Sequence, residues 1–293
     1  MAAAPPVQWR SGAPVPVPRT EVSAAAVGGR IAVVAGFTAD GSNSGRADAY
    51  DPGTNSWTRL PDLPSTVDHA SAAGWRGQML VVGGYHDGAP TTNVWALTQG
   101  RWETLPSLPQ PRAAAAAAVV GDTLYVVGGV TQTPLGRELA RNALALDLRA
   151  RRWRTIPGPT RREHLAAAAS GGRVYALGGR LAGVDTNRTE LEVYDAPARR
   201  WRRLPPIPQA RGGTGAAALN GRIVSVGGEA PQGTLARVYA YRVATRRWTR
   251  LPDLPTPRHG LGVVALNGRV YVLAGGPKPG LFVSDANESL RVP

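Results

Sequence analysis

A pair of glycines that closes a short apolar run recurs along this chain at nearly constant intervals. The runs include LVVGG at 80–84, YVVGG at 125–129 and YALGG at 175–179, and IAVVAG at 31–36 is a degenerate first copy. The glycines that end the six copies lie 45 to 50 residues apart: Gly36, Gly84, Gly129, Gly179, Gly228 and Gly276. A period of this length indicates a repeat protein in which each unit forms one small supersecondary structure.

Two further landmarks keep the same period. A tryptophan precedes a Leu-Pro or Ile-Pro pair in five units, at Trp57, Trp102, Trp153, Trp201 and Trp248. Seven residues before each tryptophan lies another large side chain, at Tyr50, Trp95, Leu146, Tyr194 and Tyr241. Three landmarks that share one period indicate a true repeat.

Each unit is predicted to form four antiparallel strands. A run of small residues, such as AAAAAAVV at 113–120, leads through a tight turn into the apolar run that ends at the glycine pair. Asn-Gly occupies this turn at 220–221 and 267–268, and it suits hairpin turns with positive φ at both central residues. A variable loop, an alternating strand and the Trp strand complete the unit. Recurrent glycines and prolines argue against helices, so the alanine runs fit a crowded inner strand.

The glycine doublet, the aromatic residue seven positions before Trp and the Trp itself resemble the kelch repeat over essentially the whole chain. The resemblance implies four-stranded blades of a β-propeller. We therefore expect an all-β, six-bladed propeller and a single domain spanning 1–293. The expected blades are 19–64, 65–109, 110–159, 160–208, 209–255, and 256–293 completed by 5–18. The sixth unit lacks its own Trp and Trp9 supplies one, so the N-terminal strand is predicted to close the ring.

An arginine stands at the entry of the inner strand in five of the six units, a position that we call the arginine slot. The five residues are Arg19, Arg112, Arg162, Arg211 and Arg258. The second unit has Val67 there. In a kelch-like propeller the inner strand lines the central channel, so these guanidinium groups would form a positively charged mouth that suits carboxylate or phosphate. In the alternative interpretation, each arginine hydrogen-bonds backbone or pairs with an acid of the next blade.

Other polar residues are also expected near this mouth. Glu21, His69 and His164 lie two positions after the slot, and His259 is one residue out of register. Neutral imidazole can bind a ligand or a metal ion. We nevertheless predict no metal site, because ligands on separate blades rarely converge with the geometry that a metal ion needs.

The loops that follow the glycine pairs should lie on the same face as the slot. Their first residues include Phe37, Tyr85, Arg180 and Glu229. Loops on a rigid scaffold are common places for recognition. The complete set of predicted ligand-binding residues is Arg19, Arg112, Arg162, Arg211, Arg258, His69, His164, Tyr85, Arg180 and Glu229.

Composition narrows the possible functions. The absence of Cys excludes a disulfide framework and a cysteine nucleophile. The net charge of +14 is carried almost entirely by arginine, which fits either a GC-rich coding bias or an anionic partner. Further arginines on the outer strands of the third to fifth units are interpreted as a solvated face, and nucleic-acid binding is not expected. No membrane span is expected. The start MAAAPPVQWR lacks a secretory signal, so we expect a cytoplasmic protein, with a trimmed secreted form as the alternative.

Two hypotheses about function follow. The first is a non-enzymatic, monomeric interaction module without a cofactor, which binds an acidic protein segment or another anionic ligand at the arginine-lined mouth. The second is a sugar-acid epimerase or mutarotase that resembles the six-bladed N-acetylneuraminate epimerases, with Glu21, Glu229, His69 and His164 as acid-base candidates. A galactose-oxidase-like copper site is excluded because it requires Cys. The iron motif Glu-x-x-x-Asp-x-x-x-His of nitrile-specifier-like proteins is absent. We therefore assign no catalytic residue.

Overall fold

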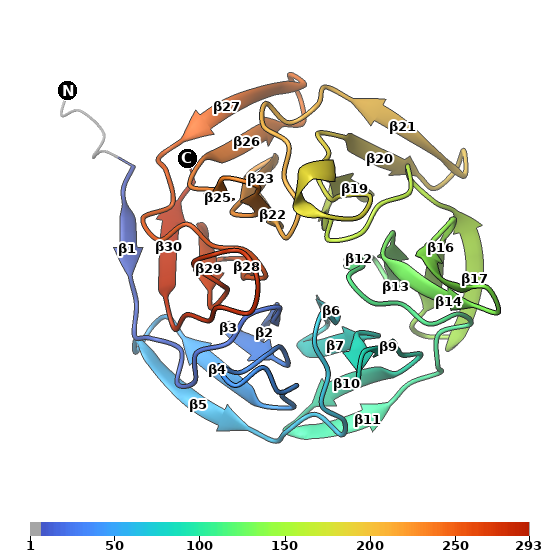
Figure 1. The fold of residues 1–293 in the computed structure, drawn as a ribbon, viewed down its shortest axis with the longest axis horizontal. Helices are drawn as coiled ribbons and strands as arrows, with labels where there is room; N and C mark the ends of the chain where they lie inside the picture. The colour runs from blue at the N-terminus through green and yellow to red at the C-terminus, as the bar shows by residue number, and fades with distance from the viewer. Residues whose placement is uncertain (1–6, 293) are drawn as a thin grey trace.

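Six four-stranded antiparallel sheets are arranged in a ring around a central channel in the computed structural model, which describes residues 7–292 (Figure 1). The predicted all-β, six-bladed fold is therefore confirmed. The helix in these residues is a single 3-10 turn, η1 (Val184–Thr186). Within the described residues, we find no helix of the length and apolar character needed to cross a membrane.

Each blade runs from an inner strand at the channel to an outer strand at the rim. Blade one contains β2 (Ser23–Val27), β3 (Arg30–Val34), β4 (Ala47–Asp51) and β5 (Ser56–Leu60). Blade two contains β6 (Ser71–Trp75), β7 (Gln78–Val82), β10 (Val94–Thr98) and β11 (Arg101–Thr104). Blade three contains β12 (Ala116–Val120), β13 (Thr123–Val127), β16 (Asn142–Asp147) and β17 (Arg152–Pro157).

The other three blades repeat this order. Blade four contains β18 (Ala166–Ser170), β19 (Arg173–Leu177), β20 (Leu191–Asp195) and β21 (Arg200–Leu204). Blade five contains β22 (Gly215–Leu219), β23 (Arg222–Val226), β26 (Val238–Arg242) and β27 (Arg247–Leu251). Blade six contains β28 (Gly262–Leu266), β29 (Arg269–Leu273), β30 (Asn287–Arg291) and β1 (Trp9–Ser11). Short hairpins follow the glycine pairs: β8 (Tyr85–His86) with β9 (Ala89–Pro90), β14 (Val130–Thr133) with β15 (Gly136–Leu139), and β24 (Glu229–Ala230) with β25 (Gly233–Thr234).

The N-terminal strand closes the ring as predicted. Strand β1 pairs with β30 in antiparallel register, with Trp9 opposite Leu290 (Figure 1). Residues 5 and 6 of the expected closing segment, and residue 293 of the sixth unit, lie outside the described residues. The pairing covers β30, whose unpaired backbone groups could otherwise pair with another chain, and it ties the N-terminal segment to the last blade.

The Trp landmarks join neighbouring blades. The Trp57 indole N–H donates to the carbonyl oxygen of Ala13 at 2.9 Å, and Trp102 donates to Pro61 at 2.9 Å. Trp9 makes the same bond to Pro252 at 3.0 Å, across the blade five–blade six boundary. The corresponding bonds of the remaining blades run from Trp153, Trp201 and Trp248 to Pro106, Pro157 and Pro205. Each such bond contributes about 0.5–1.5 kcal/mol to stability. Trp9 is thus a structural residue.

Blade two departs from the repeat at its outer hairpin. Tyr50 and Trp57 are directly opposite in blade one, but in blade two Trp102 lies opposite Leu97. Trp95 pairs with Thr104 instead, because the blade-two hairpin turn is shorter than its counterparts. The assignment of Trp95 to the landmark seven residues before Trp is therefore wrong in register.

The hydrophobic core lies between blades, and the channel wall is built of small residues. Each core cluster joins residues of two adjacent blades. Farther along the inner strands from the channel mouth, the channel wall is formed mainly by alanines. A Cβ atom added to Gly74 in blade two would lie 2.4 Å from the carbonyl oxygen of Ala26 in blade one. Larger side chains would overpack the ring at a cost of about 1–3 kcal/mol, which confirms the crowded inner strand.

Candidate functional site

One end of the channel is encircled by a belt of backbone hydrogen bonds. Its members occupy the position two residues after the arginine slot and share a left-handed backbone, with φ between 48° and 62°. We call these six residues the mouth ring: Glu21, His69, Ala114, His164, Gly213 and Gly260. From His69 onward, each amide donates to the carbonyl of the ring residue in the preceding blade, and the Val22 amide closes the belt on Gly260. The left-handed conformation turns these residues out of the strand register, so their side chains need not pack inside a blade.

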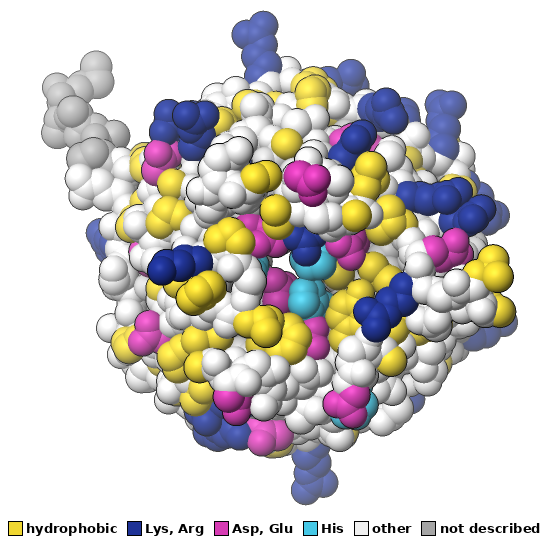
Figure 2. Space-filling view, in the orientation of Figure 1, with side chains coloured by type: hydrophobic (Ala, Val, Ile, Leu, Met, Phe, Trp, Pro, Cys, Tyr) yellow, Lys and Arg dark blue, Asp and Glu magenta, His cyan; other side chains and the backbone are white. Residues whose placement is uncertain are grey.

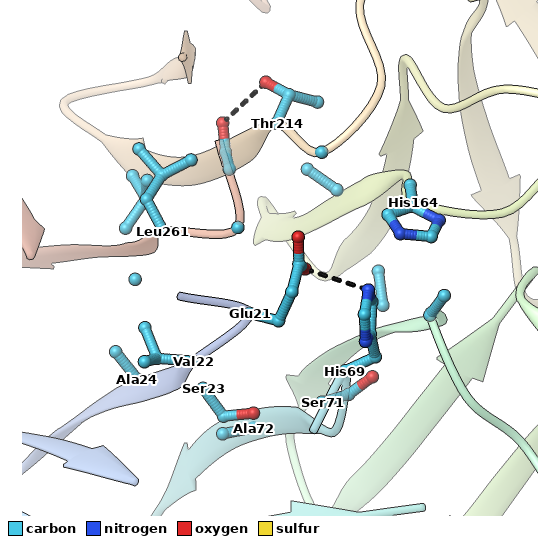
Figure 3. A pocket seen from close by; sticks show the side chains of 18 of the residues that line it. Glu21, Val22, Ser23, Ala24, His69, Ser71, Ala72, His164, Thr214 and Leu261 are labelled. Atoms are coloured by element: carbon cyan, nitrogen blue, oxygen red, sulfur yellow. Dashed lines mark hydrogen bonds and ion pairs between the residues drawn. The ribbon is translucent and has the colours of Figure 1, made fainter. Parts of the chain in front are cut away.

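Three members of the mouth ring carry polar side chains that converge. Glu21, His69 and His164 each offer one potential metal-ligating atom, and these atoms lie within 4.8 Å of one another. Figure 3 shows the Glu21 carboxylate directed at His69, with His164 beside them. They surround the upper end of a cavity of about 140 Å³. Figure 2 shows histidine and acidic side chains around this opening.

The imidazole of His69 lies between two carboxylates. Its Nε2 atom is 3.3 Å from Glu21, and its Nδ1 atom donates to Asp68. Burial alone would lower the pKa of His69, but the carboxylates of Glu21 and Asp68 outweigh burial and raise it. Burial would likewise raise the pKa of Glu21, but the charges of His69 and His259 hold it far below its usual range. Glu21 is therefore an ionised carboxylate between two imidazoles.

His164 has the opposite electrostatic environment. The guanidinium of Arg180 lies 3.0 Å from its Nε2 atom, and Glu163 lies 3.3 Å from its Nδ1 atom. Burial lowers the pKa of His164, and the charges of His69 and Arg180 lower it further despite the favourable contact with Glu163. The Nε2 atom accepts a hydrogen bond from Arg180, which requires the neutral imidazole.

Arg180 and Glu229, the first residues after two of the glycine pairs, complete the polar mouth. Arg180 donates to Glu163 at 3.2 Å and to Glu229 at 2.5 Å. His259 donates to Glu21 at 3.1 Å and to the carbonyl of Lys278 at 3.0 Å. Burial would lower the pKa of His259, but Glu21 and Glu229 raise it. The mouth is thus a network of alternating charges.

Tyr85 stands at the edge of this network. Its ring makes an edge contact with His69, at 5.6 Å between centroids. The Arg137 guanidinium lies 5.5 Å from the centroid of the Tyr85 ring. Burial, together with the charge of Glu163, raises the pKa of Tyr85 to about 12, so the phenol keeps its proton at neutral pH.

The arginine slot does not face the mouth. All five slot arginines are 0–1% exposed, the largest buried side chains of the described residues. Three of them pair with a carboxylate of their own blade: Arg19 with Asp48, Arg162 with Glu192, and Arg258 with Glu288. The remaining guanidinium hydrogens go largely to strand carbonyls, such as those of Gly178 and Ala274. The acid belongs to the same blade, not to the next one as the alternative interpretation expected.

The other two slot arginines have neutral partners. Arg112 donates to the Asn142 side chain at 2.5 Å, and burial lowers its pKa to about 10. Arg211 lies over the Tyr239 ring at 5.2 Å and close to Ser225, and burial lowers its pKa to about 10 as well. Both remain cationic at neutral pH. Because the five guanidinium groups fill the blades, the expected positively charged funnel does not form from Arg19, Arg112, Arg162, Arg211 and Arg258.

The glycine doublets and the arginine slot form one structural unit. In blades one to five the last glycine of the apolar run donates its amide to the slot carbonyl of the next blade, as Gly84 does to Arg112 at 2.8 Å. In blade six Gly275, rather than Gly276, makes this bond to Arg19, so the sequence landmark at Gly276 is one residue out of register. A Cβ atom on Gly83 would lie 2.1 Å from that carbonyl oxygen. The doublet is therefore required by close backbone contact between blades, as expected for repeated structural glycines.

The structure brings together five of the ten sequence-predicted ligand-binding residues: His69, His164, Tyr85, Arg180 and Glu229. Sequence reasoning missed Asp68 and Glu163, which support the two imidazoles. The available signal was that each of these acids directly precedes its histidine at an equivalent position of two blades. The reason given against a metal site is also corrected, because the belt brings side chains of different blades within 4.8 Å.

Two surface features surround this site. The exposed large hydrophobic side chains of residues 7–292 all lie on loops that follow glycine pairs: Leu135, Leu181, Leu281 and Phe282. The basic residues of the outer strands are exposed at the rim, and several form surface ion pairs, such as Arg151 with Glu103 and Arg250 with Asp253. The second feature agrees with a solvated basic face.

Comparison with known proteins supports the repeat assignment. The KLHDC2/KLHL20/DRC7 Kelch-repeats domain matches residues 7–158 and 98–276. The chain is 28% identical over 243 residues to Kelch-like protein terF of Aspergillus terreus, which covers 77% of this chain and 53% of that protein. It is 29% identical over 213 residues to Kelch-like protein 25 of Xenopus tropicalis, covering 69% and 35%. It is 22% identical over 223 residues to Beta-scruin of Limulus polyphemus, covering 72% and 24%.

The chain thus spans about half or less of the length of these relatives. The matched residues include nearly all of the ring. They contain the glycine doublets and the Trp residues that bond neighbouring blades. The chain belongs to the kelch-repeat family.

Proposed function

We propose that this propeller is a non-catalytic protein-interaction module whose partner docks on the face that carries the channel mouth. The observation that carries the proposal is the position of Leu135, Leu181, Leu281 and Phe282. These exposed apolar side chains lie on three separate loops around one face, with exposed fractions of 43% to 101%. Loops on a rigid scaffold commonly carry recognition, and exposed apolar side chains on them are available to a partner that covers this face.

A groove between two of these loops supports the proposal. It has a volume of about 250 Å³ and is lined by residues that include Tyr85, Val130, Leu139 and Leu181. Arg137 and Glu163 border the same groove. An apolar anchor of a partner would fill such a depression, and the flanking charges would fix its orientation.

The acidic nature of the partner has a weaker basis than the docking face. The five slot arginines are buried, and the loops expose both signs of charge. Exposed bases on these loops include Arg137, Arg237 and Lys278, and exposed acids include Asp40, Asp87 and Asp185. The proposed interface is therefore the face with the channel mouth, as predicted, and the contacts come from the loops around it. The binding experiment determines the net charge of the partner.

The test compares two sets of surface substitutions. Tagged wild-type protein is crosslinked in extract of the source cells, and the captured partner is then purified for affinity measurements. The triple variant Leu135→Ser, Leu181→Ser, Phe282→Ser should lose at least tenfold in affinity. The matched control Arg154→Ser, Arg203→Ser, Arg247→Ser, on exposed outer strands, should keep it. Loss of affinity only in the control set would move the interface to the basic rim and contradict the proposal.

The epimerase alternative has one observation in its favour and one against it. Glu21 and Glu229 are nearly buried carboxylates beside imidazoles, an arrangement that acid-base chemistry can use. The cavity of about 140 Å³ is smaller than the roughly 300–1,000 Å³ of typical small-molecule sites. Proton NMR of N-acetylneuraminate with the protein decides this question. Anomeric exchange that is accelerated by the wild type and lost in Glu229→Gln would make the protein an enzyme.

A further inference from the structure

We propose that Glu21, His69 and His164 bind a divalent transition-metal ion at the centre of the channel mouth. Two imidazole nitrogens and one carboxylate are a ligand set that suits Zn²⁺ and neighbouring first-row ions, whereas Ca²⁺ and Mg²⁺ prefer oxygen ligands throughout. The three ligand atoms come from three blades and lie within 4.8 Å of one another. The site goes beyond the proposed protein interaction and does not depend on it.

The separation of the first two ligands already fits a bound ion. His69 Nε2 and Glu21 Oε2 are 3.3 Å apart. Two ligands on a tetrahedral ion with bonds of about 2.0–2.1 Å are separated by about 3.3 Å. In this structure the two groups form an ion pair, so a metal ion would replace the proton on His69 Nε2.

Each imidazole has a carboxylate behind it, as metal-binding histidines usually have. Asp68 accepts a hydrogen bond from His69 Nδ1, whereas Glu163 lies 3.3 Å from His164 Nδ1 without forming a hydrogen bond to it. Each carboxylate belongs to the residue that precedes its histidine, in blades two and four. A carboxylate on Nδ1 fixes the ring orientation and leaves Nε2 as the ligand atom. His259 supports Glu21 in the same way, at 3.1 Å from its other carboxylate oxygen.

Arg180 contacts His164 Nε2, the atom that would bind the metal ion as its third ligand. Its guanidinium is 3.0 Å from His164 Nε2, and a cation there competes with a metal ion for the same lone pair. Glu163 and Glu229 hold the other two guanidinium nitrogens, so a metal ion that binds His164 has to displace this guanidinium from His164. On this account, Arg180 weakens metal binding.

The experiment titrates Co²⁺ into the chelator-treated protein and follows visible absorption, with Zn²⁺ added afterwards as a competitor. Saturable binding of one ion per chain, displaced by Zn²⁺ but not by Mg²⁺, is the expected result. Glu21→Gln and His69→Ala should abolish the visible bands. Asp68→Asn keeps all three ligands and should weaken binding about 10–100-fold.

Two further variants separate a metal site from a merely structural ion-pair network. His86→Ala removes an exposed histidine outside the mouth and should bind Co²⁺ like the wild type. Arg180→Ala should bind Co²⁺ more tightly, because no guanidinium competes for His164. Circular dichroism verifies that each variant is folded. A wild type without saturable binding, equal losses in His86→Ala and Asp68→Asn, or weaker binding in Arg180→Ala would each overturn the proposal.

Discussion

The arginine slot and the mouth ring lie two residues apart on the same chain segments, yet they differ in almost every respect. The slot carries Arg in five blades, and these side chains are fully buried inside the blades. The mouth ring carries Glu, His, Ala or Gly, and its polar side chains face the channel. The repeated position, the arginine slot, therefore stabilises each blade. The varying position, the mouth ring, determines which chemical groups line the channel mouth.

The physical reason is the environment that each position must satisfy. Four of the five slot arginines donate to the equivalent carbonyl at the end of the second strand of their own blade, although their side-chain partners differ from blade to blade. A mouth-ring residue contributes only its backbone to the belt, and its left-handed φ directs the side chain away from the blade core. The side chain can therefore change without loss of the ring.

The largest expected effect is at a slot arginine that has an acidic partner. Arg162→Ala leaves Glu192 buried without its cation and several strand carbonyls without a donor. Removal of one partner of a buried pair costs about 3–5 kcal/mol. Arg161→Ala removes the exposed neighbour and should change stability by less than about 0.5 kcal/mol. Urea unfolding of both variants tests this, and similar midpoints would show that the slot is not structural.

A smaller effect is expected where the slot arginine has neutral partners. Arg211→Ala leaves hydrogen-bond acceptors at Ser225 and Gly227, but it strands no buried carboxylate. The cost of an unsatisfied neutral group is about 1–3 kcal/mol. Arg211→Ala should therefore lie between Arg161→Ala and Arg162→Ala in the same unfolding series. A loss as large as that of Arg162→Ala would show that the carboxylate contributes little.

The mouth ring should respond to backbone changes. Gly260→Ala places a Cβ atom 2.7 Å from the backbone nitrogen of Glu21, at φ +58, and should cost about 1–2 kcal/mol. Gly213→Ala meets its nearest neighbour at 3.2 Å, so it should cost less. Thermal melts give the order. The belt model is in error if Gly213→Ala is the more damaging change.

The fold could be predicted from sequence because its causes repeat. Gly84 and its counterparts, the Trp residues that bond neighbouring blades, and the alanine runs meet the same packing requirements in successive blades. The last unit has no Trp of its own, and this identified the segment around Trp9 as the closing strand. Register within a blade was harder: Trp95 was misassigned because a shortened turn moves the pairing of one hairpin, and the seven-residue spacing does not reveal that shift.

The candidate site could be predicted only in part. His69, His164, Tyr85, Arg180 and Glu229 were placed near the mouth because the repeat fixes their register. Repetition misled the interpretation of the slot arginines, since a spacing pattern gives the position of a side chain along the strand but not whether it is buried. The convergence of Glu21 with the two histidines depends on the left-handed backbone. Only Gly213 and Gly260 are residues of a type that favours positive φ at this position, and the other four blades carry Glu, His or Ala there.

The smallest expected effect concerns Trp75, which lies outside the repeated Trp position. It tests whether this departure from the repeat forms a contact between blades. Trp75 is off-pattern, and its indole donates to Asp122 of the next blade at 3.0 Å, beside Arg76 and Arg149. Hydrogen bonds from Arg76 and Trp75 lower the pKa of Asp122 to about 2. A carboxylate with a depressed folded-state pKa adds stability above its unfolded pKa of about 3.8 and loses that contribution as the pH falls toward 2.

Asp122→Asn should therefore lower the melting temperature slightly at pH 7, and the difference from the wild type should shrink between pH 4 and pH 2. Asp87→Asn, at an exposed acid whose nearest basic partner is His86 at 3.7 Å, is the control and should show no such pH dependence. Because the Asp122 side chain is partly exposed to solvent, the effect stays well below that of Arg162→Ala. A pH-dependent difference would make Trp75 and Asp122 a local inter-blade contact. A constant difference would show that the ionised form of Asp122 contributes nothing to this contact.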